Sequence, residues 1–164
     1  MKRRNLGRLP VGDAGVDKTI TEMCRMARSD ASSSEVQRVV AQFRTDDWGF
    51  LNDAFRYVVK TVPYISDPKG EEFVVAPRHL IAKRWVGGDC DDMSTLLAAL
   101  LLAGGRKCWF KTIEWKPDVS GFTHVYLLGE VPSLGLAIPI DAVKGATGFG
   151  WEKRPYRRAK VYPV

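Results

Sequence analysis

The sequence predicts an α+β domain in which N-terminal helices and a central, buried, cysteine-bearing helix pack on a small antiparallel sheet. Three observations carry this prediction. Apolar residues recur at helical spacing before residue 63, and the run from Leu96 to Ala103 is apolar on every face of a helix. Strand-like segments begin only after Gly105. Helices that come first, with strands afterwards, are typical of an α+β fold.

Three helices are expected in the N-terminal part of the chain. The first covers residues 19–27. The second begins at Ser32, whose hydroxyl caps it while Glu35 reaches back three residues later. The third follows Asp46 and ends before Pro63, because proline cannot continue a helix.

A fourth helix follows an irregular stretch. Residues 63–88 are expected to be irregular, because proline and glycine interrupt them every few positions. The helix then runs from Asp89 to Ala103 and stops at Gly104 and Gly105. Since it is apolar all round, we expect protein on every side of it.

Three strands are expected after this helix. They cover residues 108–115, 123–128 and 136–141, with a turn near Pro117 between the first two. Short consecutive strands of this kind favour antiparallel pairing.

Composition excludes several classes of protein. The chain has 164 residues, 45% hydrophobic and 27% charged, which is the balance of one globular domain and excludes disordered and disulfide-scaffold proteins. Its three cysteines (Cys24, Cys90 and Cys108) are odd in number and form no CxxC pair, which indicates reduced thiols. We expect Cys24 and Cys108 to be buried and not bonded to each other.

Positive charge is concentrated at the two ends of the chain. The net charge is +6, and residues 1–8 and 151–164 each carry +4, so the middle carries −2. We therefore expect a basic N-terminal arm (1–18), a single domain (19–150) and a basic C-terminal tail (151–164), with both ends solvated. Nucleic-acid binding through these arms is a less favoured alternative.

Cys90 stands at the start of the predicted buried helix, behind Gly87 and Gly88. Unpaired N–H groups and the positive end of the helix dipole favour a thiolate there, so we expect the Cys90 pKa to lie below its ordinary value. The same N–H groups can hold the oxygen that becomes negative when the sulfur attacks a carbonyl. This is the setting of a nucleophilic cysteine, which also needs a base.

His124 and Asp141 are the candidate base and orienting group. His124 lies in the second predicted strand and Asp141 ends the third, so neighbouring strands can present both towards the helix start. Cys90, His124 and Asp141 are therefore the predicted catalytic residues. The second histidine, His79, has no such context and is interpreted as structural.

The acidic residues around Cys90 allow two interpretations. Asp89, Asp91 and Asp92 can cap the helix, and their charge would oppose a thiolate. Alternatively, they could hold a hard cation through oxygen ligands. The cluster lacks the spacing of a known calcium loop, so no metal site is assigned and no cofactor is expected.

At these residues the chain resembles the transglutaminase-like superfamily, which has the papain-like cysteine peptidase fold. The resemblance rests on the stretch Gly88–Gly105, on Thr-His-Val-Tyr around His124, and on Pro-Ile-Asp-Ala-Val around Asp141. Residues 64–68 are similar to the segment that precedes the nucleophile in small phage and prophage members. The match covers about residues 60–145.

The resemblance implies a cysteine hydrolase, a peptidase or amidase, that uses the Cys90–His124–Asp141 triad on an amide bond of a peptide or protein substrate. One alternative is a phage or prophage virion or assembly component that keeps the fold and binds phage structural proteins. Transglutaminase activity is another. The resemblance also implies a place in the bacterial host cytoplasm or on the virion. From the sequence we expect neither a signal peptide nor a membrane-spanning segment.

Overall fold

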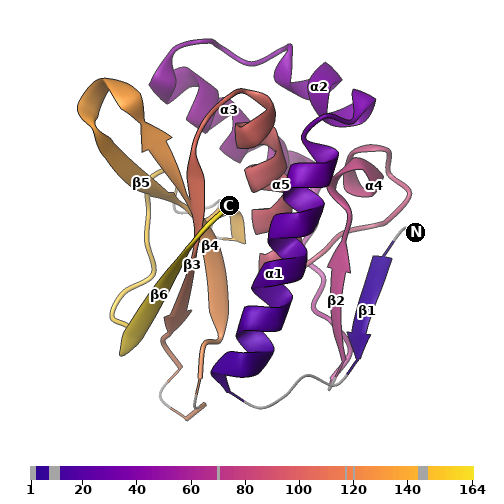
Figure 1. Cartoon of the computed structure of the whole chain (residues 1–164), viewed down its shortest axis with the longest axis vertical. Helices are drawn as coiled ribbons and strands as arrows, with labels where there is room; N and C mark the ends of the chain where they lie inside the picture. The colour runs from indigo at the N-terminus through magenta and orange to yellow at the C-terminus, as the bar shows by residue number, and fades with distance from the viewer. Residues whose placement is uncertain (1–2, 8–11, 70, 117, 120, 144–147) are drawn as a thin grey trace.

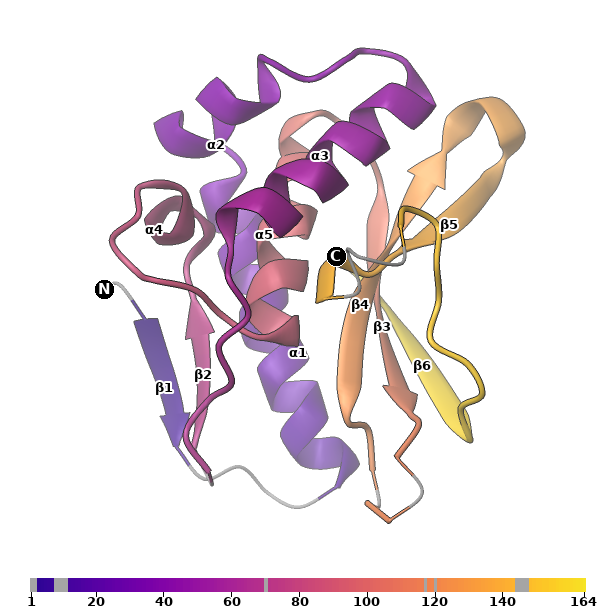
Figure 2. The same cartoon turned by 180° about the vertical axis from the view of Figure 1, so that it is seen from behind.

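Helix α5 (Cys90–Ala103) lies at the centre of the molecule, between a layer of helices and a four-stranded sheet (Figures 1 and 2). Its residues from 91 to 101 are buried, as the all-round apolar pattern predicts. This arrangement confirms the predicted α+β fold. The structure is a computed structural model, and it describes residues 3–7, 12–69, 71–116, 118–119, 121–143 and 148–164.

Four further helices surround α5. They are α1 (Asp13–Asp30), α2 (Ser34–Val40), α3 (Asp47–Thr61) and α4 (Pro77–Ile81). All four contact α5, and α1 runs along its length. Buried Met23 and Leu51 come from the inward faces of α1 and α3 and belong to the same core as α5.

The starts of α1 and α2 differ from the prediction. Helix α1 begins at Asp13, well before the expected residue 19. Ser33, not Ser32, caps α2 by accepting a hydrogen bond from the Val36 N–H (3.4 Å). Ser32 instead donates to the carbonyl at the end of α1, which places it in the preceding turn.

The main sheet is antiparallel and has the strand order β5-β4-β3-β6. Strand β3 (Cys108–Glu114) lies in its middle beside β4 (His124–Val131), and β5 (Leu136–Ile140) and β6 (Arg158–Pro163) form its edges. The first three match the predicted strands, although β4 continues three residues further than expected. The predicted turn at Pro117 lies outside the described residues.

Residues 63–88 are more regular than predicted. They contain strand β2 (Glu72–Val75) and helix α4, and β2 pairs antiparallel with β1 (Arg3–Gly7). The buried side chains of Val74 and Val75 hold β2 against the core. A four-residue strand between prolines and glycines is too short to show an alternating pattern, which is why the expectation was wrong.

The basic ends of the chain are not solvated arms where the structure describes them. Arg4 lies in β1 and pairs with Glu22 on α1 (2.8 Å). In β6, Arg158 and Lys160 pair with Asp13 and Asp17 (3.0 and 2.9 Å). The basic segment is therefore an edge strand, which pairs with β3 through its backbone and with α1 through these ion pairs. Residues 1–2 and 8–11 of the predicted arm lie outside the described residues.

The two cysteines away from the helix start are unbonded, as predicted, and Cys108 is buried. Cys24 is only half-buried, contrary to the prediction, and its thiol donates to the Pro163 carbonyl (3.7 Å) at the end of β6. His79 is buried in α4, as expected for a structural histidine. No helix among the described residues is long and apolar enough to cross a membrane.

Candidate active site

Two glycines bring the chain close to the start of α5. The Ile65 N–H donates to the Gly88 carbonyl (2.9 Å), and the Gly88 N–H donates to the Pro63 carbonyl (3.1 Å). A Cβ on Gly87 would collide with the Pro63 carbonyl oxygen, and one on Gly88 would collide with the Cβ of Asp92. Both positions therefore exclude any side chain, and the loop is held against the helix end.

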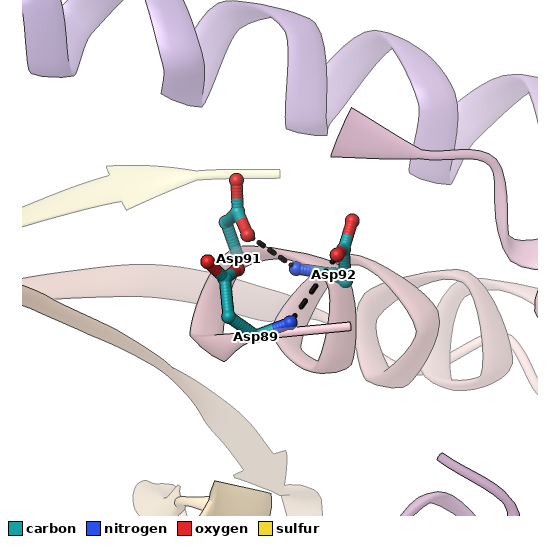
Figure 3. Close-up of side chains that lie close together, drawn as sticks. All are labelled: Asp89, Asp91 and Asp92. Atoms are coloured by element: carbon teal, nitrogen blue, oxygen red, sulfur yellow. Dashed lines mark hydrogen bonds between the residues drawn. The ribbon is translucent and has the colours of Figure 1, made fainter. Parts of the chain in front are cut away.

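Asp92 ties the start of α5 to strand β2. One of its carboxylate oxygens accepts from the Val75 N–H (2.6 Å) and the other from the Asp89 N–H (3.2 Å). Asp91 accepts from the Asp92 N–H through Oδ1 (2.8 Å), as Figure 3 shows. Asp92 therefore caps the helix, one of the two roles that the sequence allows for these acids.

Cys90 is the first residue of α5 and is held against β4. Its sulfur accepts a hydrogen bond from the Val125 N–H, one residue beyond His124. The hydroxyl of Ser94 donates to the Cys90 carbonyl (2.6 Å) and also lies 3.3 Å from the Val125 carbonyl. The first turn of the helix is thus fastened to the strand that carries the histidine.

His124 is anchored by Asp141. Its Nε2 lies 2.7 Å from Oδ2 of Asp141, which is buried and also accepts the Val143 N–H through Oδ1 (3.2 Å). With Nε2 held in this way, Nδ1 is the ring nitrogen that can take a proton. The ring of Tyr126 flanks the imidazole, with ring centroids 5.8 Å apart.

Cys90 and His124 line one cavity of about 400 Å³. Residues of α1, Glu72 of β2 and the exposed Tyr64 also line it. Asp141 lies behind His124, outside the lining. The structure therefore brings Cys90 and His124 to the same space and links His124 to Asp141.

The Cys90 pKa is raised, contrary to the prediction. Burial of the thiol and the neighbouring Asp89 carboxylate raise it to about 12, with smaller contributions from Glu72 and Asp141. The Val125 N–H acts in the opposite direction but does not compensate. Burial and the neighbouring acids outweigh the Val125 N–H, so the thiol form of Cys90 is favoured.

Glu72 is a site residue that the sequence analysis did not identify. Burial and the Asp89 charge raise its pKa to about 7, while the side chains of Asp91 and Thr19 act in the opposite direction. Burial also raises the pKa of Asp91 well above its usual range and that of Asp92 to about 8. In the sequence, the only signal for Glu72 is the Glu-Phe-Val-Val segment. This segment is hard to recognise as a strand because it lies within a stretch that proline and glycine interrupt.

The three aspartates form a compact group with oxygen atoms within 4.8 Å of one another. Carboxylates at such distances can share a cation. However, both oxygens of Asp92 and one oxygen of Asp91 already accept backbone N–H groups. The group therefore offers a metal ion few unoccupied ligand atoms.

Comparison with solved structures gives one informative likeness. The chain superposes on the crystal structure of a "putative cysteine protease" from Cytophaga hutchinsonii with a TM-score of 0.50 and 14% sequence identity. The match covers 99% of this chain and 62% of that protein, so the chain spans less than two-thirds of its length. At this identity the likeness shows a cysteine-protease-like fold and nothing finer. No family model matches the sequence, and a search of curated proteins finds no match.

Proposed function

We propose that this protein is a cysteine hydrolase, a peptidase or amidase of the transglutaminase-like type, that cleaves an amide bond of a peptide or protein. The observation that carries the proposal is the cavity shared by Cys90 and His124, with His124 held by Asp141 at 2.7 Å. A thiol, an imidazole and an orienting carboxylate in this order are the groups that nucleophilic acyl transfer needs. The cysteine-protease-like fold supports the same class.

The raised pKa of Cys90 determines how the thiol is activated. Because a preformed thiolate is disfavoured, His124 takes the thiol proton as the sulfur attacks the carbonyl carbon, so the imidazole acts as a general base. N–H groups in the first turn of α5 hold the resulting oxyanion. Asp141 stabilises the imidazolium and keeps its orientation.

Acyl transfer then proceeds through a thioester on Cys90. The imidazolium returns its proton to the leaving amine, the C–N bond breaks, and a thioester joins the acyl group to Cys90. His124 then removes a proton from water, which attacks the thioester; the carboxylic acid leaves and the thiol is restored. An amine in place of water gives the transglutaminase outcome.

A thiol-directed peptide probe tests this proposal. We expect an electrophilic peptide, such as a peptidyl vinyl sulfone, to label the wild type and not Cys90→Ala. Cys24→Ala, which removes a half-buried thiol outside the cavity lining, is the matched control and should be labelled like the wild type. Labelling that persists in Cys90→Ala, or casein and peptide-library digests that show no Cys90-dependent cleavage, would exclude the hydrolase.

A further inference from the structure

Three carboxyl groups line the cavity beside Cys90. Glu72 comes from β2, and Asp89 and Asp91 come from the start of α5. No lysine or arginine is among the lining residues that the structure describes. The described part of the cavity wall therefore carries three carboxyl groups, from two separate elements, and no lysine or arginine.

These acids lack counter-charges within the described part of the chain. The ion pairs found there involve other carboxylates, such as Glu22, Asp30 and Glu114, and none involves Glu72, Asp89 or Asp91. A buried carboxylate without a cation is costly unless it is protonated or meets a cation from elsewhere. The cavity is the place from which such a cation can arrive.

Asp91 gives the clearest indication of a missing partner. Its side chain is 4% exposed, and Oδ1 accepts the Asp92 N–H. Oδ2 is buried and has no hydrogen-bond donor among the described residues, and Figure 3 shows it pointing away from the Asp92 amide. Its neighbours are the carboxyl groups of Asp89 and Glu72, which can donate only while one of them holds a proton.

The rest of the cavity wall suits an organic cation better than a metal ion. Apolar side chains of α1 (Val16, Ile20 and Met23) and Phe122 line the space, and its volume of about 400 Å³ is large enough to admit a long side chain. A lysine or arginine can lay its aliphatic stem along such a wall and place its charged head among carboxylates. A metal ion would find Asp92 and half of Asp91 already occupied by backbone N–H groups.

We propose that this cavity is a specificity pocket for a basic side chain, in which Glu72, Asp89 and Asp91 bind the guanidinium or ammonium group of an arginine or lysine in the substrate. The inference rests on the proposed function, because it names the substrate class of the same site. Binding replaces the protons that the raised pKa values of Glu72 and Asp91 favour with the positive charge of the ligand. It also brings a cation close to Asp89 and Glu72, two of the acids that disfavour ionisation of Cys90.

The test measures binding without requiring turnover. Isothermal titration calorimetry with Cys90→Ala compares acetyl-Ala-Arg-Ala-amide with the same peptide carrying citrulline, which has the shape of arginine without its charge. We expect the arginine peptide to bind about ten-fold more tightly or better, as charge-assisted hydrogen bonds to buried carboxylates predict. Equal affinities of the two peptides would overturn the proposal.

Variants locate the binding site. In the same Cys90→Ala background, Glu72→Gln and Asp91→Asn should each reduce the preference for arginine over citrulline at least several-fold. Asp91→Asn keeps the oxygen that accepts the Asp92 N–H, and circular dichroism checks the fold of both variants. Glu71→Gln makes the same charge change at an exposed neighbour outside the cavity and should keep the full preference. A preference that survives both cavity variants would overturn the proposal.

Two further outcomes separate this inference from the proposed function. Arginine-selective binding without any Cys90-dependent cleavage would support the pocket and contradict the hydrolase. Cys90-dependent cleavage with no preference for basic peptides would support the hydrolase and overturn the pocket. Calcium chloride is titrated in parallel, and saturable calcium binding with no arginine preference would also overturn the proposal, in favour of a metal site.

Discussion

At Cys90, two effects of opposite sign compete for the thiol proton. The helix end and the Val125 N–H favour the thiolate, whereas burial and the Asp89 charge favour the thiol and prevail, with a pKa of about 12. Since the thiolate is the reactive form, alkylation of the resting protein by iodoacetamide should be slow at pH 6.5. It should rise steadily above pH 8 and not reach a plateau before pH 10.

Removing the acid that contributes most after burial should reverse part of this effect. Asp89→Asn deletes a negative charge near the sulfur, so the Cys90 pKa falls and labelling at pH 8 should be several-fold faster. Intact-protein mass spectrometry over pH 6–10 measures both rates, and Glu71→Gln serves as a charge-matched control. Rapid labelling of the wild type at pH 6.5 would instead mean that Cys90 and His124 form an ion pair at rest.

In the proposed mechanism, Asp141 acts through His124 as a positioning residue. Asp141→Asn removes the charge that stabilises the imidazolium while keeping a side chain of the same size, so kcat should fall about 10²-fold or more. Alkylation of Cys90 at pH 9 should not slow, because this reaction does not need the base and Asp141 is one of the charges that raise the Cys90 pKa. Asp53→Asn, on α3 and away from the cavity, should leave kcat unchanged. An equal loss of both readouts would indicate a damaged fold.

The loop before α5 packs so closely against the Pro63 carbonyl that position 87 has no room for a side chain. Gly87→Ala would push a methyl group into the Pro63 carbonyl, so the loop must move away from the helix start. We expect a loss of about 1–3 kcal/mol in the free energy of unfolding, measured by urea denaturation. Val86→Ala changes the adjacent, 79% exposed side chain and should cost less than about 0.5 kcal/mol. Similar losses in both variants would contradict the close-packed loop.

Elements with long, consistent patterns could be predicted from the sequence, whereas short ones could not. Helix α5 and the strand carrying His124 stand out because their apolar residues repeat over many positions. The sequence does not predict strand β6, because its basic residues indicate a solvated tail, and their partners Asp13 and Asp17 on α1 are distant in the chain. The alternation of polar and apolar residues in Arg158–Pro163 was the available signal.

The same limitation explains the error at the site. The pairing of His124 with Asp141 follows from the positions of two neighbouring strands, which the sequence indicates. The Cys90 pKa is raised chiefly by burial of the thiol, with Asp89 next and Glu72 contributing less. Burial depends on how distant parts of the chain pack around the start of α5, and local patterns carry no information about that packing.

For the whole molecule, the carboxyl cluster makes stability depend on pH near neutrality. The Glu72 pKa is raised to about 7 and that of Asp92 to about 8, so the folded protein binds these protons more tightly than the unfolded chain. Their contribution to stability is complete below about pH 4 and is lost as pH rises through 7–8. The melting temperature should therefore fall between pH 5.5 and pH 8.

Differential scanning calorimetry at these two pH values measures the effect. Glu72→Gln should flatten the dependence, because glutamine does not titrate, and Glu71→Gln should keep the wild-type slope. The Asp47 pKa of about 2 belongs to a group that matters only under acidic conditions and does not interfere. A melting temperature that rises between pH 5.5 and pH 8 would contradict the raised pKa values.

The contact between β6 and α1 has a consequence for the order in which the chain folds. Tyr162 donates a hydrogen bond to Asp17 (2.8 Å) across a sequence separation of 145 residues. Closing so long a loop costs conformational entropy before any contact repays it, so this edge strand should dock after the folding transition state. Tyr162→Ala should then accelerate unfolding in stopped-flow experiments and leave the refolding rate nearly unchanged. Refolding slowed in proportion to the lost stability would place the strand in the nucleus instead. On this view the outer strand determines how long the native state persists, and the elements around α5 determine how quickly it forms.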